Sequence, residues 1–177
     1  MTVEAWLRGS IPGVPPLLMP VAHAITQSKE ELRAVTQGLT AAQLWERPGG
    51  AAAVGFHLRH IPGSADRLLT YALGRSLTED QLAALADERE PIAATAADLL
   101  DDVDAVLDRV LHEVRRTPEE RLLEPRHVGR ARLPSTVLGL LFHIAEHTQR
   151  HTGQVIATAK FVRTRSEPGT SPPGRSG

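Results

Sequence analysis

Three histidines at a regular spacing are the residues of this sequence best suited to chemistry. His143, His147 and His151 follow one another at intervals of four within an apolar stretch from Leu138 to Val162. In a helix this spacing turns each ring by only about 40° from the previous one, so the rings share one broad face. Neutral imidazole is a ligand for zinc, nickel, copper and iron, and two histidines four residues apart form a recognised pair of ligands. Because the shared face is also the apolar one, the stretch predicts an inward-facing metal site.

A third ligand is expected from an earlier helix, predicted over Ala52 to Leu73, which carries His57 and His60. These two residues are three apart and diverge by about 60°, so only one of them should point at the partner helix. We select His60, because it lies beside the apolar Ile61 and just before Pro62, where we expect a kink or a broken turn that aims its ring. His57 is the competing candidate.

The residues around the histidine pair narrow the chemistry. We expect His143 to pack beside the site or to support it, because three successive turns of one helix do not easily converge on one small ion. Glu146 is turned by about 100° from His147, which is typical of a solvated or supporting carboxylate more than of a general base. The interval between His147 and His151 lacks the glutamate of the HExxH motif. A zinc peptidase is therefore disfavoured.

Three neutral imidazoles would leave a divalent ion its full charge and, in a tetrahedral arrangement, one position for water or a substrate atom. Such an ion can bring the pKa of a bound water or thiol towards neutrality. The chain contains no cysteine, so any thiol must come from another molecule. We expect a metal-dependent enzyme. Two alternatives remain open, namely a non-catalytic metal-binding or stress-response bundle and a protein-binding bundle whose site has been lost.

Composition limits the class of protein. A length of 177 residues suits one domain, expected over residues 1–164 and followed by a flexible tail over residues 165–177. The net charge of −1 gives no reason to expect binding to nucleic acid or to an anionic membrane. No apolar run approaches the roughly 18 residues of a membrane span, and prolines interrupt the first twenty residues. We therefore predict a cytoplasmic protein.

The apolar residues recur at helical spacing in four long stretches, which predicts an all-α four-helix bundle. A short extra helix is expected between the second and third of these, opened by Thr78, and an extended hairpin near His127 between the third and fourth. We expect Ser135 to cap the fourth helix. The four stretches are predicted over Val21 to Gln37, Ala52 to Leu73, Ala96 to Arg116, and Leu138 to Val162.

Two segments of the sequence resemble the DinB-like family of metal-binding four-helix bundles. One is the segment from Ala51 to Gly74, and the other surrounds His147, His151, Gly153 and Gln154, which match the family's HxxxHxGQ motif. The resemblance covers residues 17 to 163. It implies a bundle that holds a divalent ion through one histidine of the second helix and two of the fourth. In this sequence these ligands are His60, His147 and His151.

The resemblance also implies a function, because the family includes thiol-dependent enzymes such as bacillithiol S-transferases and mycothiol-dependent maleylpyruvate isomerase. It implies a small-molecule substrate or low-molecular-weight thiol as partner, and a homodimer. Zinc or nickel fits three imidazoles best, and manganese or iron is a further candidate for the divalent ion. The implied activity is an S-transferase or a hydrolase.

Overall fold

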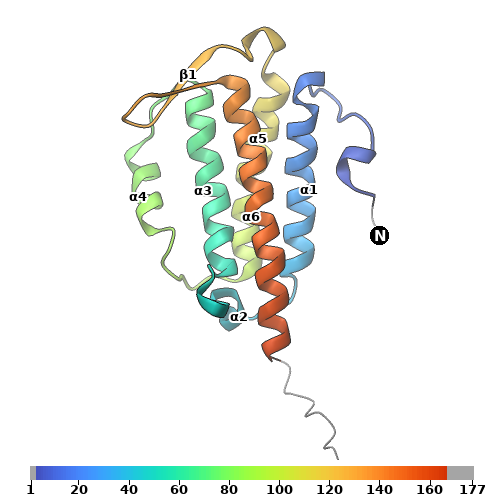
Figure 1. The fold of residues 1–177 in the computed structure, drawn as a ribbon, viewed down its shortest axis with the longest axis vertical. Coiled ribbons are helices and arrows are strands. Elements are labelled where there is room, and N and C mark those ends of the chain that lie inside the picture. Colours follow the sequence, from blue (N-terminus) through green and yellow to red (C-terminus); the bar gives the residue numbers. More distant parts are fainter. Residues whose placement is uncertain (1–2, 167–177) are drawn as a thin grey trace, which may run out of the picture.

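Four amphipathic stretches form four long helices that bury their apolar faces against one another (Figure 1). The structure is a computed structural model and describes residues 3–166. The long helices are α1 (Met19–Thr36), α3 (Val54–Ala72), α5 (Ala96–Arg116) and α6 (Val137–Ser166). The predicted all-α four-helix bundle is confirmed. Helix α6 extends two residues into the range predicted as a tail, and the remainder of that range lies outside the described residues.

Each long helix has two neighbours in the bundle. Helix α6 packs against α1 and α3, and α5 packs against the same two helices from the other side. Figure 1 shows that α1 and α6 run in one direction and that α3 and α5 run in the other. Fully buried side chains from all four helices fill the space between them, including Ile25, Leu58, Leu107 and Ile144. The antiparallel pair of α3 and α6 therefore forms one side of the bundle.

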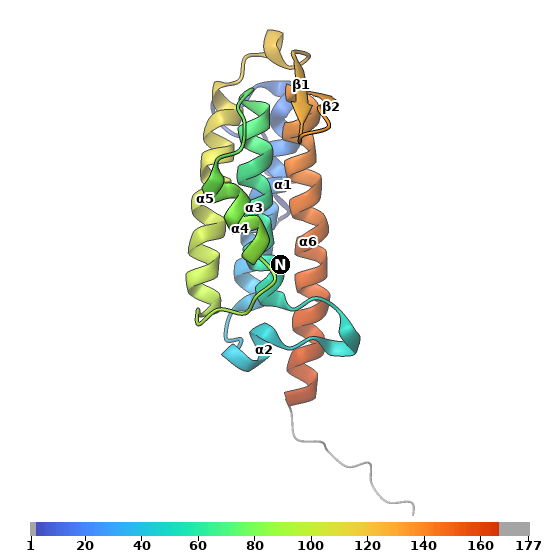
Figure 2. The same ribbon diagram turned by 90° about the vertical axis from the view of Figure 1, so that its left-hand side faces the viewer.

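Shorter elements join the long helices at both ends of the bundle (Figure 2). Helix α2 (Ala41–Trp45) lies at the end where α1 finishes, and helix α4 (Glu79–Asp87) lies against the outside of α3. The strands β1 (Pro125–Val128) and β2 (Leu133–Thr136) form an antiparallel hairpin that leads into α6. The extra helix and the hairpin were both predicted, and both are confirmed.

Local sequence signals account for the starts of several helices. Capping boxes open α4 and α5, where the hydroxyls of Thr78 and Thr95 accept from the backbone N–H three residues later. The cap predicted for α6 is wrong. Ser135 lies in β2, and it is the Thr136 hydroxyl that accepts from the Gly139 N–H at 3.0 Å. The hairpin ends one residue later than the sequence pattern suggests, so the cap moves with it.

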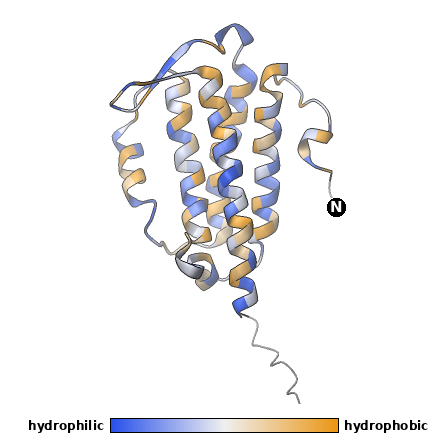
Figure 3. Ribbon diagram, viewed as in Figure 1, coloured by the Kyte–Doolittle hydropathy of each residue, from blue (hydrophilic) through white to orange (hydrophobic). Residues whose placement is uncertain are grey.

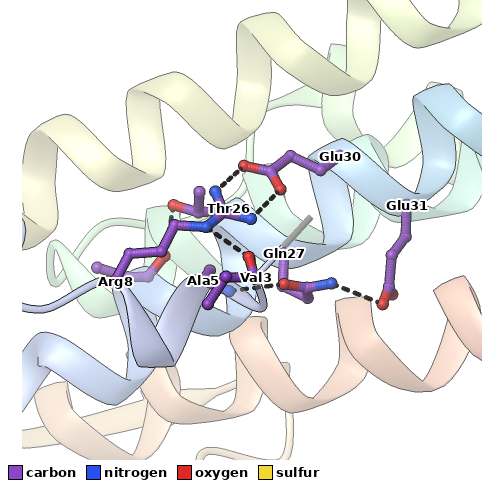
Figure 4. A network of polar contacts seen from close by, with 8 residues as sticks. Val3, Ala5, Arg8, Thr26, Gln27, Glu30 and Glu31 are labelled. Carbon is purple, nitrogen blue, oxygen red and sulfur yellow. Dashed lines mark hydrogen bonds and ion pairs between the residues drawn. The ribbon is translucent and has the colours of Figure 1, made fainter. Parts of the chain in front are cut away.

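The N-terminal segment is fixed to α1 by a polar network (Figure 4). Arg8 makes a paired contact with both carboxylate oxygens of Glu30 at 2.6 Å, and Gln27 accepts from the Ala5 N–H at 2.8 Å. A further bond at 2.8 Å joins the His23 ring to the carbonyl of Gly9. His23 thus has a structural partner. Within residues 3–166, every helix is too short or too polar to cross a lipid bilayer.

Candidate metal centre

Helices α3 and α6 bring together the three histidines that were predicted as ligands. The ligand atoms of His60, His147 and His151 all lie within 4.8 Å of one another. His60 Nε2 and His147 Nε2 are 2.9 Å apart, and the ring of His151 lies 4.5 Å from each of the other two rings, centre to centre. The sequence from His147 to His151 is polar throughout, and the middle of α6 is correspondingly hydrophilic in Figure 3. Two of the three rings therefore come from a polar stretch in the middle of α6.

The separations suit a single metal ion. Histidine nitrogen binds zinc at about 2.0–2.1 Å, so two such nitrogens on one ion lie at most about 4 Å apart. The 2.9 Å between His60 Nε2 and His147 Nε2 is within that reach, and the ligand atom of His151 lies within 4.8 Å of both. His147 Nδ1 is buried and has no hydrogen-bond partner among the described residues. The cluster is therefore not a closed hydrogen-bond network of its own.

Glu88, at the end of α4, fixes the orientation of His60. Its Oε2 lies 2.8 Å from His60 Nδ1, and its Oε1 accepts from Arg67 Nη1 at 2.5 Å. The side chain of Glu88 is only 7% exposed. When the Nδ1–H of neutral His60 donates to this carboxylate, the lone pair is on Nε2, which lies 2.9 Å from His147 Nε2. In metal sites, a carboxylate bonded in this way to a ligating histidine orients the ring and raises its basicity.

One stripe of α3 is shaped to receive this carboxylate. Arg59 donates to the backbone carbonyls of Asp87 and Glu90 and so holds the segment on either side of Glu88. Four residues further on, a Cβ added at Gly63 would lie 2.5 Å from the Glu88 carboxylate. Arg67 follows after four more residues, so these α3 residues lie one turn apart on the same face. Gly63 is therefore the position where the carboxylate enters.

Of the kink or broken turn expected at Pro62, the broken turn does not occur. Helix α3 is continuous from Val54 to Ala72, with Pro62 inside it and buried. The sequence pattern Pro62–Gly63 was interpreted as a defect that aims His60. In the structure the ring is instead aimed by its bond to Glu88, and the glycine provides the space for that bond. The position of the ring thus depends on a residue from another helix.

Electrostatics around Glu88 favour its ionised form. Burial raises the pKa of this carboxyl, but the hydrogen bonds from His60 and Arg67 outweigh burial, so its pKa lies below the ordinary value. A negative charge is therefore present beside His60 at neutral pH. It would partly balance the charge of a cation held on the other side of that ring.

The imidazoles of His147 and His151 are in the protonation state that metal binding requires. Burial, followed by the proximity of His60, lowers the pKa of His147 to about 4 and that of His151 to about 3. Both rings are thus neutral at pH 7 without any metal. Only neutral imidazole offers a lone pair to a cation, so protons compete weakly at this site.

His57 lies behind the cluster and not in it. It is only 2% exposed, and its Nδ1 lies 2.9 Å from His151 Nδ1. Because that nitrogen of His151 is engaged, its Nε2 is the atom left for the cluster. Burial, and then the proximity of His60, lowers the pKa of His57 to about 4. His57 therefore supports His151, much as Glu88 supports His60.

His143 lies at the edge of the site. Its side chain is 45% exposed, and its Nδ1 lies 2.7 Å from Glu146 Oε1. Glu146 also accepts from Arg150 at 2.6 Å, so this carboxylate is engaged by two neighbours. Neither residue belongs to the three-histidine cluster, and the supporting role expected of them stays a prediction.

Comparison with known proteins assigns a family. Residues 24–155 match the family model of the DinB superfamily. The chain belongs to the DinB superfamily. The match runs from α1 to α6 and includes all three clustered histidines, so the resemblance predicted from the sequence is confirmed. No curated protein matches this DinB-superfamily chain. The family and the three-histidine cluster are compatible with metal binding.

Glu88 is the residue that sequence reasoning missed. It is 28 residues from His60 and lies in a segment that was interpreted only as a connecting helix. No spacing rule links the end of one helix to a ring on another. The available signal was the glycine inside a helical pattern, since an internal glycine often marks a close approach by another group.

Proposed function

We propose that His60, His147 and His151 bind one divalent metal ion and that the ion makes this DinB-superfamily protein a metal-dependent enzyme. The observation that supports this best is the convergence of three imidazoles, whose ligand atoms lie within 4.8 Å of one another and one of which is bonded to a buried carboxylate. Zinc or nickel fits this all-nitrogen set best, with manganese or iron as further candidates. When bound, such an ion supplies Lewis-acid activation of water or of a thiol.

The protein's own residues would perform the remaining tasks. Glu88 and His57 hold the rings of His60 and His151 in place, so little rearrangement accompanies binding. The chain has no cysteine, so the thiol of an S-transferase reaction would have to be a separate small molecule. A hydrolase using water is the other reaction type that this site suits. The homodimer implied by the family resemblance remains a prediction.

Metal analysis of tag-free protein tests the proposal directly. We expect about one divalent ion per chain in the wild type, and loss of at least about tenfold in affinity in His147→Ala and His151→Ala, because each removes one of three ligands. His112→Ala is the matched control, since it removes an exposed histidine of α5 that lies outside the cluster, and it should keep its metal. Equal metal content in all variants, or none in the wild type, would refute the site.

The alternative hypothesis is a non-catalytic bundle in which the metal is structural. The stability of the fold after metal removal distinguishes it from an enzyme. The bundle buries a core from all four long helices without using the histidines. A chelator should therefore leave the fold intact and abolish activity towards an electrophile and thiol, or towards a hydrolysable ester. Unfolding of the helices on chelation would favour the structural role instead.

A further inference from the structure

A cavity of about 580 Å³ opens beside the metal centre at the start of α3. It lies between three segments, namely the end of α2 and the residues after it, the first turn of α3, and the residues that follow Glu88. Aromatic and charged side chains contribute to its walls, among them Trp45, Arg47, Phe56, Arg89 and Glu90. Its volume is in the range of sites for small organic ligands.

One ring contact and one chain segment connect the cavity to the three-histidine cluster. The ring of Phe56 stacks on that of His60, with centres 5.4 Å apart and planes within 15°. Arg89 directly follows Glu88, the carboxylate that holds His60, and the backbone on either side is held by Arg59. A molecule in the cavity would thus lie against the same two segments that position a metal ligand.

The cavity carries unused positive charge. Arg47 and Arg89 are both exposed, and neither side chain has a hydrogen bond or ion pair with any residue from 3 to 166. Most other arginines of the bundle have such partners, for example Arg67 with Glu88 and Arg109 with Asp66. The one carboxylate at the wall is that of Glu90, so two guanidinium groups leave one net positive charge. Guanidinium forks favour carboxylate groups.

The rest of the wall suits a flat apolar body. Trp45 lies so close to α3 that a Cβ at Gly55 would be 2.9 Å from three of its ring atoms. The indole is therefore held as a rigid surface, and Phe56 on α3 supplies a second ring. Aromatic walls bind planar rings by stacking and by burial of apolar area.

We propose that this cavity binds a small aromatic or similarly planar carboxylate, and that this molecule is the substrate of the adjacent metal centre. The carboxylate contacts Arg47 and Arg89, and the flat body lies between Trp45 and Phe56. The role as substrate rests on the proposed metal function, whereas binding of the anion does not. A second cavity, of about 500 Å³, lies on the His57 side, but its guanidinium, that of Arg165, lies 3.7 Å from the Glu46 carboxylate. The anion is therefore assigned to the cavity with unpaired arginines.

Tryptophan fluorescence provides the test. The chain has two tryptophans, so Trp6→Phe leaves Trp45 as the single reporter. In metal-free full-length protein, benzoate should change this fluorescence saturably. Arg47→Gln and Arg89→Gln should each lower the affinity for benzoate by about tenfold or more, since each removes a charged hydrogen-bond donor. Arg130→Gln, an exposed arginine of the distant hairpin, is the matched control and should bind like the parent.

Two comparisons define what would overturn the proposal. Benzyl alcohol, which has the ring without the charge, should bind at least about tenfold more weakly than benzoate. No saturable change with benzoate, an equal affinity for benzyl alcohol, or an equal loss in Arg130→Gln would refute the anion site. Zinc should raise benzoate affinity by about fivefold or more through the nearby charge, and an unchanged affinity in zinc-loaded protein would refute the role as substrate site. Failure of metal binding itself is detected separately by metal analysis.

Discussion

At the scale of the residue, the arrangement depends on Glu88. A buried carboxylate is costly unless hydrogen bonds satisfy it, and here one oxygen faces His60 while the other accepts from Arg67. The same two bonds that stabilise the charge also fix the imidazole. One residue therefore couples the stability of the α4 connection to the geometry of the candidate site.

Replacing Glu88 by Gln should weaken metal binding. The amide keeps the shape but loses the charge that supports His60, and supporting residues of this kind typically contribute about 10–100-fold to metal affinity. The measurement is competition for zinc against a chromogenic chelator. Glu90→Gln, two residues away and exposed, is the control and should bind zinc like the wild type. Equal zinc affinities for all three proteins would show that zinc binding does not need the charge of Glu88 beside His60.

At the scale of the element, the internal glycines of α3 and α6 serve different purposes. A Cβ at Gly63 would meet the Glu88 carboxylate at 2.5 Å, whereas a Cβ at Gly153 would have nothing within 4 Å. Both are helical positions, and alanine normally stabilises a helix by about 1 kcal/mol over glycine. The difference between the two sites therefore isolates the effect of crowding the carboxylate.

Gly153→Ala should raise the free energy of unfolding by up to about 1 kcal/mol, because it adds helix propensity without a clash. Gly63→Ala should give no gain or a net loss, and should also weaken zinc binding, because Glu88 is buried and bonded twice and has little room to move. Urea unfolding and zinc competition measure the two effects. A stabilising Gly63→Ala with unchanged zinc affinity would contradict the close approach inferred here.

At the scale of the whole molecule, the site makes the stability of the metal-free bundle depend on pH. The pKa values of His57 and His147 are lowered to about 4, and that of His151 to about 3. In the unfolded chain these rings return to the ordinary value of about 6.5. Between these values the unfolded chain binds more protons than the folded one, so folding stability rises with pH and is lost on acidification.

The metal-free wild type should therefore have a lower free energy of unfolding at about pH 5 than at about pH 7, as measured by urea titration with a chelator present. The double variant His147→Gln/His151→Gln lacks two of the titrating rings. Its free energy of unfolding should therefore fall less than that of the wild type between about pH 7 and about pH 5. With zinc bound, the free energy of unfolding of the wild type should fall more steeply on acidification, because protons and metal compete for the same nitrogens. A wild-type stability independent of pH over this range would contradict the neutral, buried state of the rings.

The sequence by itself determined the bundle and the histidine pair of α6. Apolar periodicity and capping residues such as Thr78 are local signals, and two histidines four apart share a helix face wherever that helix packs. Only the tertiary structure decided that Glu88 meets His60, that His57 lies behind His151, that α3 continues through Pro62, and that Thr136 caps α6. These depend on how separate elements dock. A contact between residues far apart in the chain leaves no periodic trace in the sequence, because its geometry is set by packing and not by helix pitch.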